Sequence, residues 1–208
     1  MRYKPNHDKP VSSGASAFDK GLIPWQPSTW PQVPSAYNQE FDTVLKEIFT
    51  ESLILEIQNV IDDAPSLEHR GHVVALSILC AIDTLSSYAF RDLNRNRCPA
   101  CGRTDSVGPR YQKYIEQFFP REYGVFASRI YKLYRNSITH SWNLFEATMR
   151  PGNQPIQELN GTVAVGLLHF FDSLKTSVSN FFERLSSDPE LQAAALSRYR
   201  ELQATAKK

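Results

Sequence analysis

Arg135, Asn136 and His140 lie within six residues of one another, and their side chains could together act on a phosphodiester. Histidine has an unperturbed pKa of about 6.5, so an imidazole can accept or donate a proton near neutral pH. Arginine stays cationic and offers a planar fork of N–H donors to the non-bridging oxygens of a phosphate. Together these residue types are suited to chemistry at a phosphate, with His140 to move a proton and Arg135 to stabilise developing charge.

The spacing of these residues along a helix decides which of them share a face. On an unbroken α-helix, positions five apart differ by about 140° around the axis, so Arg135 and His140 would point in different directions. Asn136 and His140, four positions apart, would share a face, and Arg129 lies on the same stripe. We therefore predict binding roles for Asn136 and Arg129, and Asn136 could also orient the imidazole. Arg135 would arrive by a helix break, by its long reach or from a second subunit.

The Arg-Asn-x-x-x-His run at 135–140 resembles the signature of the HEPN superfamily, whose members are short helical bundles with an Arg-x4–6-His motif. The aromatic residues before the arginine and the asparagine after it add to the resemblance, which covers residues 37–186. It implies a metal-independent endoribonuclease that cleaves RNA by 2′-hydroxyl attack, with a composite cleft at the interface of a homodimer.

The same resemblance suggests a biological setting and an alternative function. The enzyme would be a toxin or an antiphage effector, with an antitoxin or regulatory protein as a further partner. The alternative is a non-catalytic module of the same fold that binds nucleotide or RNA or serves in dimerisation. The enzyme requires Arg135 and His140 to be exposed and convergent, whereas the non-catalytic module tolerates their burial in ion pairs.

Cys98 and Cys101 belong to a Cys-Pro-Ala-Cys-Gly run that resembles one knuckle of a zinc ribbon. Two thiolates on a tight turn supply half of a tetrahedral structural zinc site, while catalysis itself needs no cofactor. Cys80 lies on an apolar helical pattern. His69 and His72 could supply the other half only if the start of their helix approached the loop, and the same pair of a second copy could also supply it. A reduced turn without metal is the alternative. A zinc-stabilised adaptor that uses this loop and the N-terminal leader is a third interpretation of the whole chain.

Basic and aromatic residues surround both features. The arginines before and around loop 94–109 suit contact with RNA phosphates, but a solvated loop has the same composition: Arg91, Arg95, Arg97, Arg103 and Arg110. Several tyrosines could stack on bases, although such residues more often belong to a core: Tyr111, Tyr114, Tyr123, Tyr131 and Tyr134. His169, on the apolar side of a later helix, is expected to be a core histidine with a satisfied hydrogen bond.

Apolar residues at helical spacing predict that these groups are positioned by an all-α bundle of five or six helices over residues 37–208. The predicted helices cover residues 36–63, 67–93, 110–119, about 121–141, 162–186 and 189–205. The buried stripe of the first helix would run from Phe41 through Leu45 to Leu55, and its outer face is acidic, with seven Asp or Glu against one Lys. The Pro-Gly and Asn-Gly pairs in segment 147–161 predict a loop or a small hairpin there.

Residues 1–36 contain six prolines and predict an extended leader without regular structure. Trp25 and Trp30 would be costly in a solvated tail, so we expect this stretch to lie along the folded body or a partner chain.

Length and composition exclude several classes of protein. The 208 residues, 41% hydrophobic and with a net charge of +1, are typical of a globular chain without a global attraction to nucleic acid or membrane. Three cysteines do not form a disulfide scaffold and favour a reducing compartment. The longest apolar run, 73–82, is too short to cross a bilayer, and no secretory signal precedes it. We therefore expect a soluble, cytoplasmic protein with no membrane partner.

Overall fold

The computed structural model describes residues 33–63, 67–90, 96–97, 104–105, 107–139, 147–150 and 152–206, and it describes only the backbone of residues 67–70, 96–97, 104–105, 135–139, 147–149 and 206. The helices are α1 (Gln39–Lys46), a π-helical segment (Glu47–Ile54), α2 (Leu55–Asp62), α3 (Leu67–Ala89), α4 (Val107–Phe118), a 3₁₀ helix (Arg121–Phe126), α5 (Ala127–Thr139), α6 (Leu167–Leu185) and α7 (Pro189–Ala206). The strands are β1 (Asn96–Arg97), β2 (Thr104–Asp105), β3 (Ala147–Arg150), β4 (Gln157–Leu159) and β5 (Thr162–Gly166).

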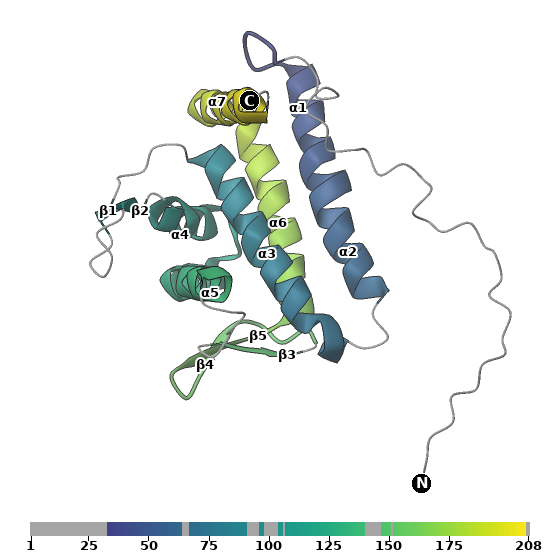
Figure 1. The fold of residues 1–208 in the computed structure, drawn as a ribbon, viewed down its shortest axis with the longest axis vertical. Helices are drawn as coiled ribbons and strands as arrows, with labels where there is room; N and C mark the ends of the chain where they lie inside the picture. Colours follow the sequence, from purple (N-terminus) through teal and green to yellow (C-terminus); the bar gives the residue numbers. More distant parts are fainter. Residues whose placement is uncertain are drawn as a thin grey trace, which may run out of the picture.

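The helices pack around α3, which contacts α2, α4, α5, α6 and α7. Helices α1–α2, α3 and α6 follow the long axis of the molecule, whereas α4, α5 and α7 are seen nearly end-on (Figure 1). The strands form only two small sheets at the edges of this assembly. The predicted all-α bundle is therefore confirmed.

The first helix of the bundle begins where the sequence predicts and contains one unforeseen feature. The side chain of Asn38 caps α1 by accepting a hydrogen bond from the backbone N–H of Phe41 at 2.8 Å. Phe41 and Leu45 are buried as expected, but Leu55 is 50% exposed. The π-helical segment between them bonds each N–H to a carbonyl five residues back, so it rotates α2 relative to α1. The expected position of Leu55 in the core was therefore wrong.

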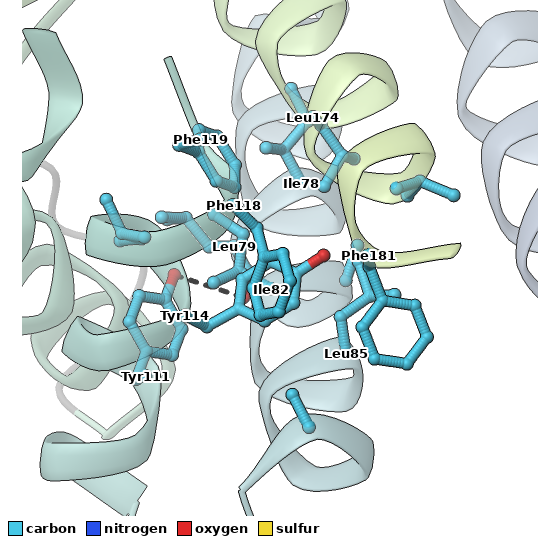
Figure 2. Close-up of a cluster of buried hydrophobic side chains, with 14 of the residues drawn as sticks. Ile78, Leu79, Ile82, Leu85, Tyr111, Tyr114, Phe118, Phe119, Leu174 and Phe181 are labelled. Carbon is cyan, nitrogen blue, oxygen red and sulfur yellow. Dashed lines mark hydrogen bonds between the residues drawn. The ribbon is translucent and has the colours of Figure 1, made fainter. Parts of the chain in front are cut away.

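The core of the protein is built from α3, α4 and α6. Ile78, Leu79, Ile82 and Leu85 project from α3 toward aromatic rings of α4 and toward α6, where Leu174 and Phe181 complete the cluster (Figure 2). The α4 residues Tyr111, Tyr114 and Phe118 are fully or almost fully buried in it. Burial of so much apolar and aromatic surface supplies the main stabilisation of the bundle.

Helix α3 contains a segment, Gly71–Ala89, that is long and apolar enough to cross a membrane by length and composition alone. Most of this segment is buried inside the protein, 61% by residue. Such burial is typical of the core helix of a soluble protein, because the neighbouring helices cover the apolar surface that lipid would otherwise cover.

The second sheet corrects one predicted helix boundary. β5 lies between β3 and β4, pairing in parallel with β3 and antiparallel with β4. β4 and β5 form the small hairpin allowed by the sequence, with a turn at Asn160 and Gly161, whose φ angles are +51° and +77°. Residues 162–166, predicted as the first turn of a helix, are β5 instead. A buried apolar run of this kind is compatible with an inner strand as well as with a helix. Pairing with β3 on one side and β4 on the other makes it a strand.

The N-terminal end of the described body is attached to the last helix. Val33 and Tyr37 pack against the core, and Arg200 of α7 donates to the carbonyl oxygens of Pro34 and Ser35, both at 2.8 Å. The end of the predicted leader therefore lies along the body, as expected. Trp25 and Trp30 lie outside the described residues.

Candidate active site

Helix α5 carries the first two residues of the Arg-Asn-x-x-x-His motif. It is helical without interruption from Ala127 to Thr139, so Arg135 and Asn136 belong to its C-terminal half. The helix is continuous from Arg135 to Thr139, so a break that separates Arg135 from His140 would have to lie after Thr139. The side chains of Arg135 and Asn136 lie outside what the structure describes, and so does the whole of His140. Their convergence stays a prediction.

The preceding turns of α5 are held in the bundle by apolar packing. Ala127, Ile130 and Leu133 are buried, and the ring of Tyr131 lies beside that of Tyr111, with centroids 5.5 Å apart. Because these positions recur every three or four residues, one face of α5 is fixed against α3 and α4. This packing defines the rotation of the helix on which the motif lies.

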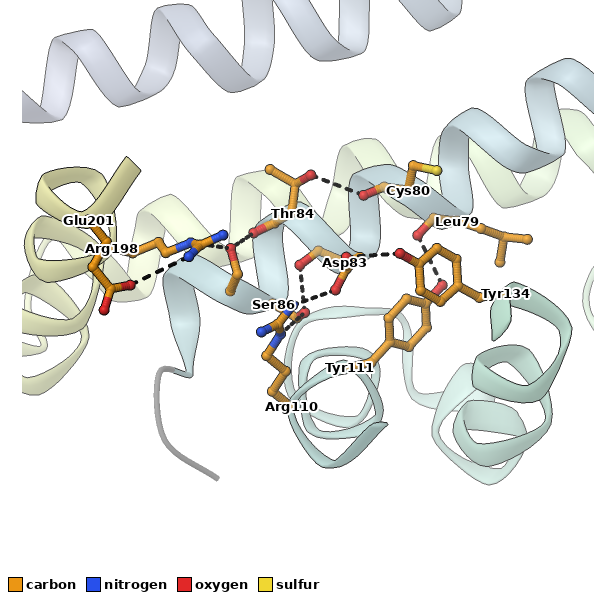
Figure 3. A network of polar contacts seen from close by, with 11 residues as sticks. Leu79, Cys80, Asp83, Thr84, Ser86, Arg110, Tyr111, Tyr134, Arg198 and Glu201 are labelled. Atoms are coloured by element: carbon orange, nitrogen blue, oxygen red, sulfur yellow. Dashed lines mark hydrogen bonds and ion pairs between the residues drawn. The ribbon is translucent and has the colours of Figure 1, made fainter. Parts of the chain in front are cut away.

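Asp83 of α3 connects the end of α5 to α4. One oxygen of its carboxylate, Oδ1, accepts from Nη2 of Arg110 at 2.6 Å, and the other, Oδ2, accepts from the hydroxyl of Tyr134 at 2.9 Å (Figure 3). The side chains of Asp83 and Arg110 are only 27% and 16% exposed. Burial raises the pKa of Tyr134, and the negative charge and hydrogen bond of Asp83 raise it further, so this hydroxyl remains a donor.

Tyr111 lies behind this cluster. Its ring stacks on that of Tyr134, with centroids 5.1 Å apart and planes 19° apart, and its own hydroxyl donates to the carbonyl oxygen of Leu79 at 3.2 Å. Burial, followed by the neighbouring Tyr134 and Asp83, raises the pKa of Tyr111. The ring of Tyr134 is thus held at its face by α4 and at its hydroxyl by α3.

Most of the tyrosines considered for base stacking belong to the core. Tyr111, Tyr114, Tyr123 and Tyr131 are buried within this chain, and Tyr134 is partly buried against it. Their rings therefore contact other side chains of the bundle. The alternative interpretation, that these tyrosines belong to the core, is correct.

Arg129, predicted to bind a phosphate, contacts the small sheet. Nη1 lies 3.1 Å from Oε2 of Glu158 on β4, and Nη2 donates to the carbonyl oxygen of Gly161 in the adjoining turn. The guanidinium connects α5 to the β4–β5 hairpin. Both groups of the ion pair are partly exposed, at 33% for Arg129 and 56% for Glu158.

His169 of α6 makes the hydrogen bond expected of a structural histidine. Its Nδ1 lies 3.0 Å from the hydroxyl oxygen of Tyr123, and the two rings stack with planes 17° apart. Burial raises the pKa of Tyr123, which keeps its hydroxyl protonated and able to donate to Nδ1. We find no reason to assign His169 to the site of Arg135.

The two cysteines of the Cys-x-x-Cys run lie outside the described residues, but the strands on either side of them are described. β1 and β2 pair antiparallel, with Asn96 opposite Asp105 and Arg97 opposite Thr104, and residues 98–103 join them in the sequence. His72 lies near the start of α3, about 25 Å along the helix from Ala89, which leads toward this hairpin (Figure 1). Because Cys98 and Cys101 lie outside the described residues, completion of a zinc site by His69 and His72 stays a prediction. Among the described residues, no three His, Cys, Asp or Glu side chains are grouped to hold a metal ion.

No role was predicted for Asp83, although it is the only Asp, Glu, Lys or Arg between Gly71 and Ala89. This isolation was a usable signal, because a carboxylate in an apolar helix requires a partner when it is buried. The identity of the partners could not be read from the sequence, since Arg110 and Tyr134 are 27 and 51 residues away.

The chain has no significant match to a protein-family model, a curated protein or a solved structure.

Proposed function

We propose that this protein is a metal-independent endoribonuclease of the HEPN type. The observation that supports this most directly is the position of Arg135 and Asn136 in the C-terminal half of α5, within an all-α bundle. A motif of the form Arg-Asn-x-x-x-His on a helix of such a bundle is what the resemblance to the superfamily requires. RNA as substrate and the odd number of three cysteines both favour a cytoplasmic location.

The proposed reaction needs no group beyond the side chains of the motif. His140 removes the proton of a ribose 2′-hydroxyl, whose oxygen attacks the adjacent phosphorus. The bond from phosphorus to the 5′-oxygen breaks, and that oxygen takes a proton from an imidazolium or from water. The products are a 2′,3′-cyclic phosphate and a 5′-hydroxyl. Arg135 stabilises the charge that develops on the non-bridging oxygens, and Asn136 holds one of these oxygens or orients the imidazole.

The proposed site is completed by a second copy of the chain. Arg135 and His140 are five positions apart, and a helix that included both would direct them about 140° apart around its axis. A two-fold dimer brings two copies of each residue to one interface, and the arginine of one protomer can then serve the histidine of the other.

A non-catalytic RNA-binding or dimerisation module is the second candidate. It is favoured by the contacts of Arg129, which is bound to Glu158 and Gly161 and not presented as a free cation. This candidate predicts binding of RNA without cleavage, or dimer formation without RNA binding.

The deciding experiment is RNA cleavage in EDTA by the purified full-length protein and its variants. We expect chelator-resistant cleavage that is lost in His140→Ala and Arg135→Ala. Lys132→Ala is the matched control, because Lys132 is an exposed cation on the same helix and its loss should leave activity unchanged. Equal activity in all variants would indicate a contaminating nuclease or another site, and inactivity of the wild type on every RNA would favour the second candidate.

Mixing the two inactive variants tests the composite site. If arginine and histidine come from different protomers, half of the randomly mixed dimers contain one restored site of two, and about a quarter of wild-type activity returns. If both residues come from one protomer, mixing restores nothing.

A further inference from the structure

The carboxylate of Asp83 binds the C-terminal half of α5 through the hydroxyl of Tyr134. Each of its two oxygens serves a different helix, because Oδ1 binds Arg110 of α4 and Oδ2 binds Tyr134 of α5 (Figure 3). Two helices that pack on α3 are thereby held at the same side chain. We call Asp83, Arg110 and Tyr134 the carboxylate latch.

Burying the charged side chain of Asp83 costs more desolvation free energy than burying an apolar side chain at the same position would. Asp83 is about three-quarters covered and lies in the most apolar stretch of the chain, so its carboxylate loses much of its hydration on folding. The ion pair with Arg110 compensates this loss, and Nε of Arg110 also donates to Oγ of Ser86 at 3.3 Å. Arg110 is therefore bound within the latch, although its position beside the basic loop first suggested contact with RNA.

Tyr134 links Asp83 to the Arg-Asn-x-x-x-His motif, because its side chain is bound to Asp83 and its backbone adjoins the motif. It immediately precedes Arg135, and its ring is held at one face by Tyr111 and at its hydroxyl by Asp83. Successive helical residues are rotated by about 100°, so a fixed direction for Tyr134 fixes the direction in which position 135 leaves the helix. The apolar contacts of Ile130 and Leu133 lie farther from the end of α5. Tyr134 is the last residue of the helix with a described side chain, and it reaches two other helices.

We infer that Asp83 is a positioning residue, which acts through Tyr134 to hold the C-terminal half of α5 in the orientation that Arg135 and Asn136 require. This inference rests on the proposed function for its catalytic consequence, but the restraint of α5 is a physical property that can be measured without any activity. Errors of about 1 Å in the position of a catalytic group can lower a rate roughly a hundredfold, so a single restraint at this point has a large effect.

The test compares two tyrosine variants that each lose one hydroxyl. Tyr134→Phe keeps the stacked ring and the Asp83–Arg110 ion pair but removes the bond to Oδ2. Tyr111→Phe is the matched control, because it removes the bond to Leu79 in the same ring pair and leaves the latch intact. Asp83→Asn is the second latch variant, since the amide nitrogen that replaces one carboxylate oxygen cannot accept the hydrogen bond from Arg110 or from Tyr134.

Amide hydrogen exchange of the full-length protein is the first measurement. We expect exchange at residues 135–139 to become roughly tenfold faster in Tyr134→Phe and in Asp83→Asn, while exchange in α6 is unchanged. In Tyr111→Phe, exchange at 135–139 should match the wild type. Unchanged exchange at 135–139 in both latch variants would overturn the inference.

Steady-state cleavage of RNA is the second measurement and separates positioning from general stability. We expect kcat of Tyr134→Phe to fall roughly tenfold with KM within about twofold of the wild type, and Tyr111→Phe to retain both values. An equal loss of kcat in both tyrosine variants would mean that Tyr134 has only a structural role and would overturn the inference. If the exchange result holds but the wild type cleaves no RNA, the restraint of α5 is supported and the proposed nuclease is rejected.

Discussion

The backbone N–H of Gly166 donates to the carbonyl oxygen of Gln154 at 2.8 Å, at the point where β5 passes into α6. A Cβ at position 166 would lie 2.5 Å from the backbone nitrogen of Gln154 and would also overlap the carbonyl oxygen of Gly152. Both obstacles are backbone atoms, which cannot rotate away. Gly166 is also paired with Arg150 at the end of β3, the strand that follows the motif in the chain.

We therefore predict that Gly166→Ala lowers the free energy of unfolding by about 2 kcal/mol or more, because overpacking against backbone forces the sheet apart. The measurement is chemical denaturation followed by circular dichroism. Gly124→Ala is the control, since a Cβ there meets no atom within 4 Å, and it should change stability by less than about 0.5 kcal/mol. Equal stability of the two variants would contradict the close approach at Gly166.

Arg129→Ala separates a structural role for this residue from the predicted role in RNA binding. The ion pair with Glu158 is partly exposed, so its loss should cost no more than about 1 kcal/mol of stability. If Arg129 serves only to connect α5 to the β4–β5 hairpin, the affinity for single-stranded RNA, measured by fluorescence anisotropy, stays within about twofold. If Arg129→Ala loses more than twofold of its affinity for RNA while Glu158→Gln keeps the affinity of the wild type, Arg129 itself binds RNA.

Asp188 provides a pH-dependent contribution to the stability of α7. Its Oδ1 accepts from the backbone N–H groups of Glu190 and Leu191 at 3.0 and 3.1 Å, so this side chain caps the start of α7. The hydrogen bond from Leu191 lowers the pKa of Asp188, and the hydrogen bond and charge of Arg184 lower it further. A carboxyl whose pKa is lower in the folded state stabilises the fold above its unfolded pKa of about 3.9 and loses this effect as the pH falls through the folded value.

We expect Asp188→Ala to lower the free energy of unfolding by about 1 kcal/mol at pH 7. The difference between wild type and variant should shrink as the pH falls below about 4. Urea denaturation at a series of pH values checks this. A difference that is constant down to pH 2 would show that the charge of the carboxylate does not contribute to the cap. Asp188→Asn, which keeps an acceptor oxygen, should lose less than the alanine variant at neutral pH.

Metal analysis tests the zinc half-site predicted for Cys98 and Cys101. A tetrahedral site completed by the same pair from a second copy corresponds to about half a zinc ion per chain, and a site completed by His69 and His72 corresponds to about one. The double variant Cys98→Ser/Cys101→Ser should lose this zinc, and Cys80→Ser should keep it. Protein refolded with zinc and reductant that retains none would favour the reduced turn without metal.

Local signals predicted most of the helices. The apolar spacing of α3 and α6 and the start of α7 at Pro189 are properties of neighbouring residues, so they can be read from the sequence. The π-helical segment and the strand character of 162–166 could not be. The first is a change in hydrogen bonding within an ordinary helical pattern, and the second depends on pairing with a strand fifteen or more residues away.

The candidate site was predictable to a smaller extent. The motif residues and their spacing lie in the sequence, and α5 was expected to carry them. The side chains that hold α5 were not predicted, because the contact between Asp83 and Tyr134 joins residues 51 positions apart. Arg110 and Arg129 were interpreted as cations available to RNA. Both are engaged with carboxylates, since a cation near the surface of a bundle is often used to neutralise a neighbouring acid.

The contact of Arg200 with Pro34 and Ser35 has a consequence for biosynthesis. These partners are separated by more than 160 residues, so the contact forms only after α7 has been synthesised and has left the ribosome. Until then the apolar side of α1 lacks one of the side chains that cover it, since Phe41 packs on Tyr199. A nascent chain arrested before α7 would therefore expose a surface that chaperones bind.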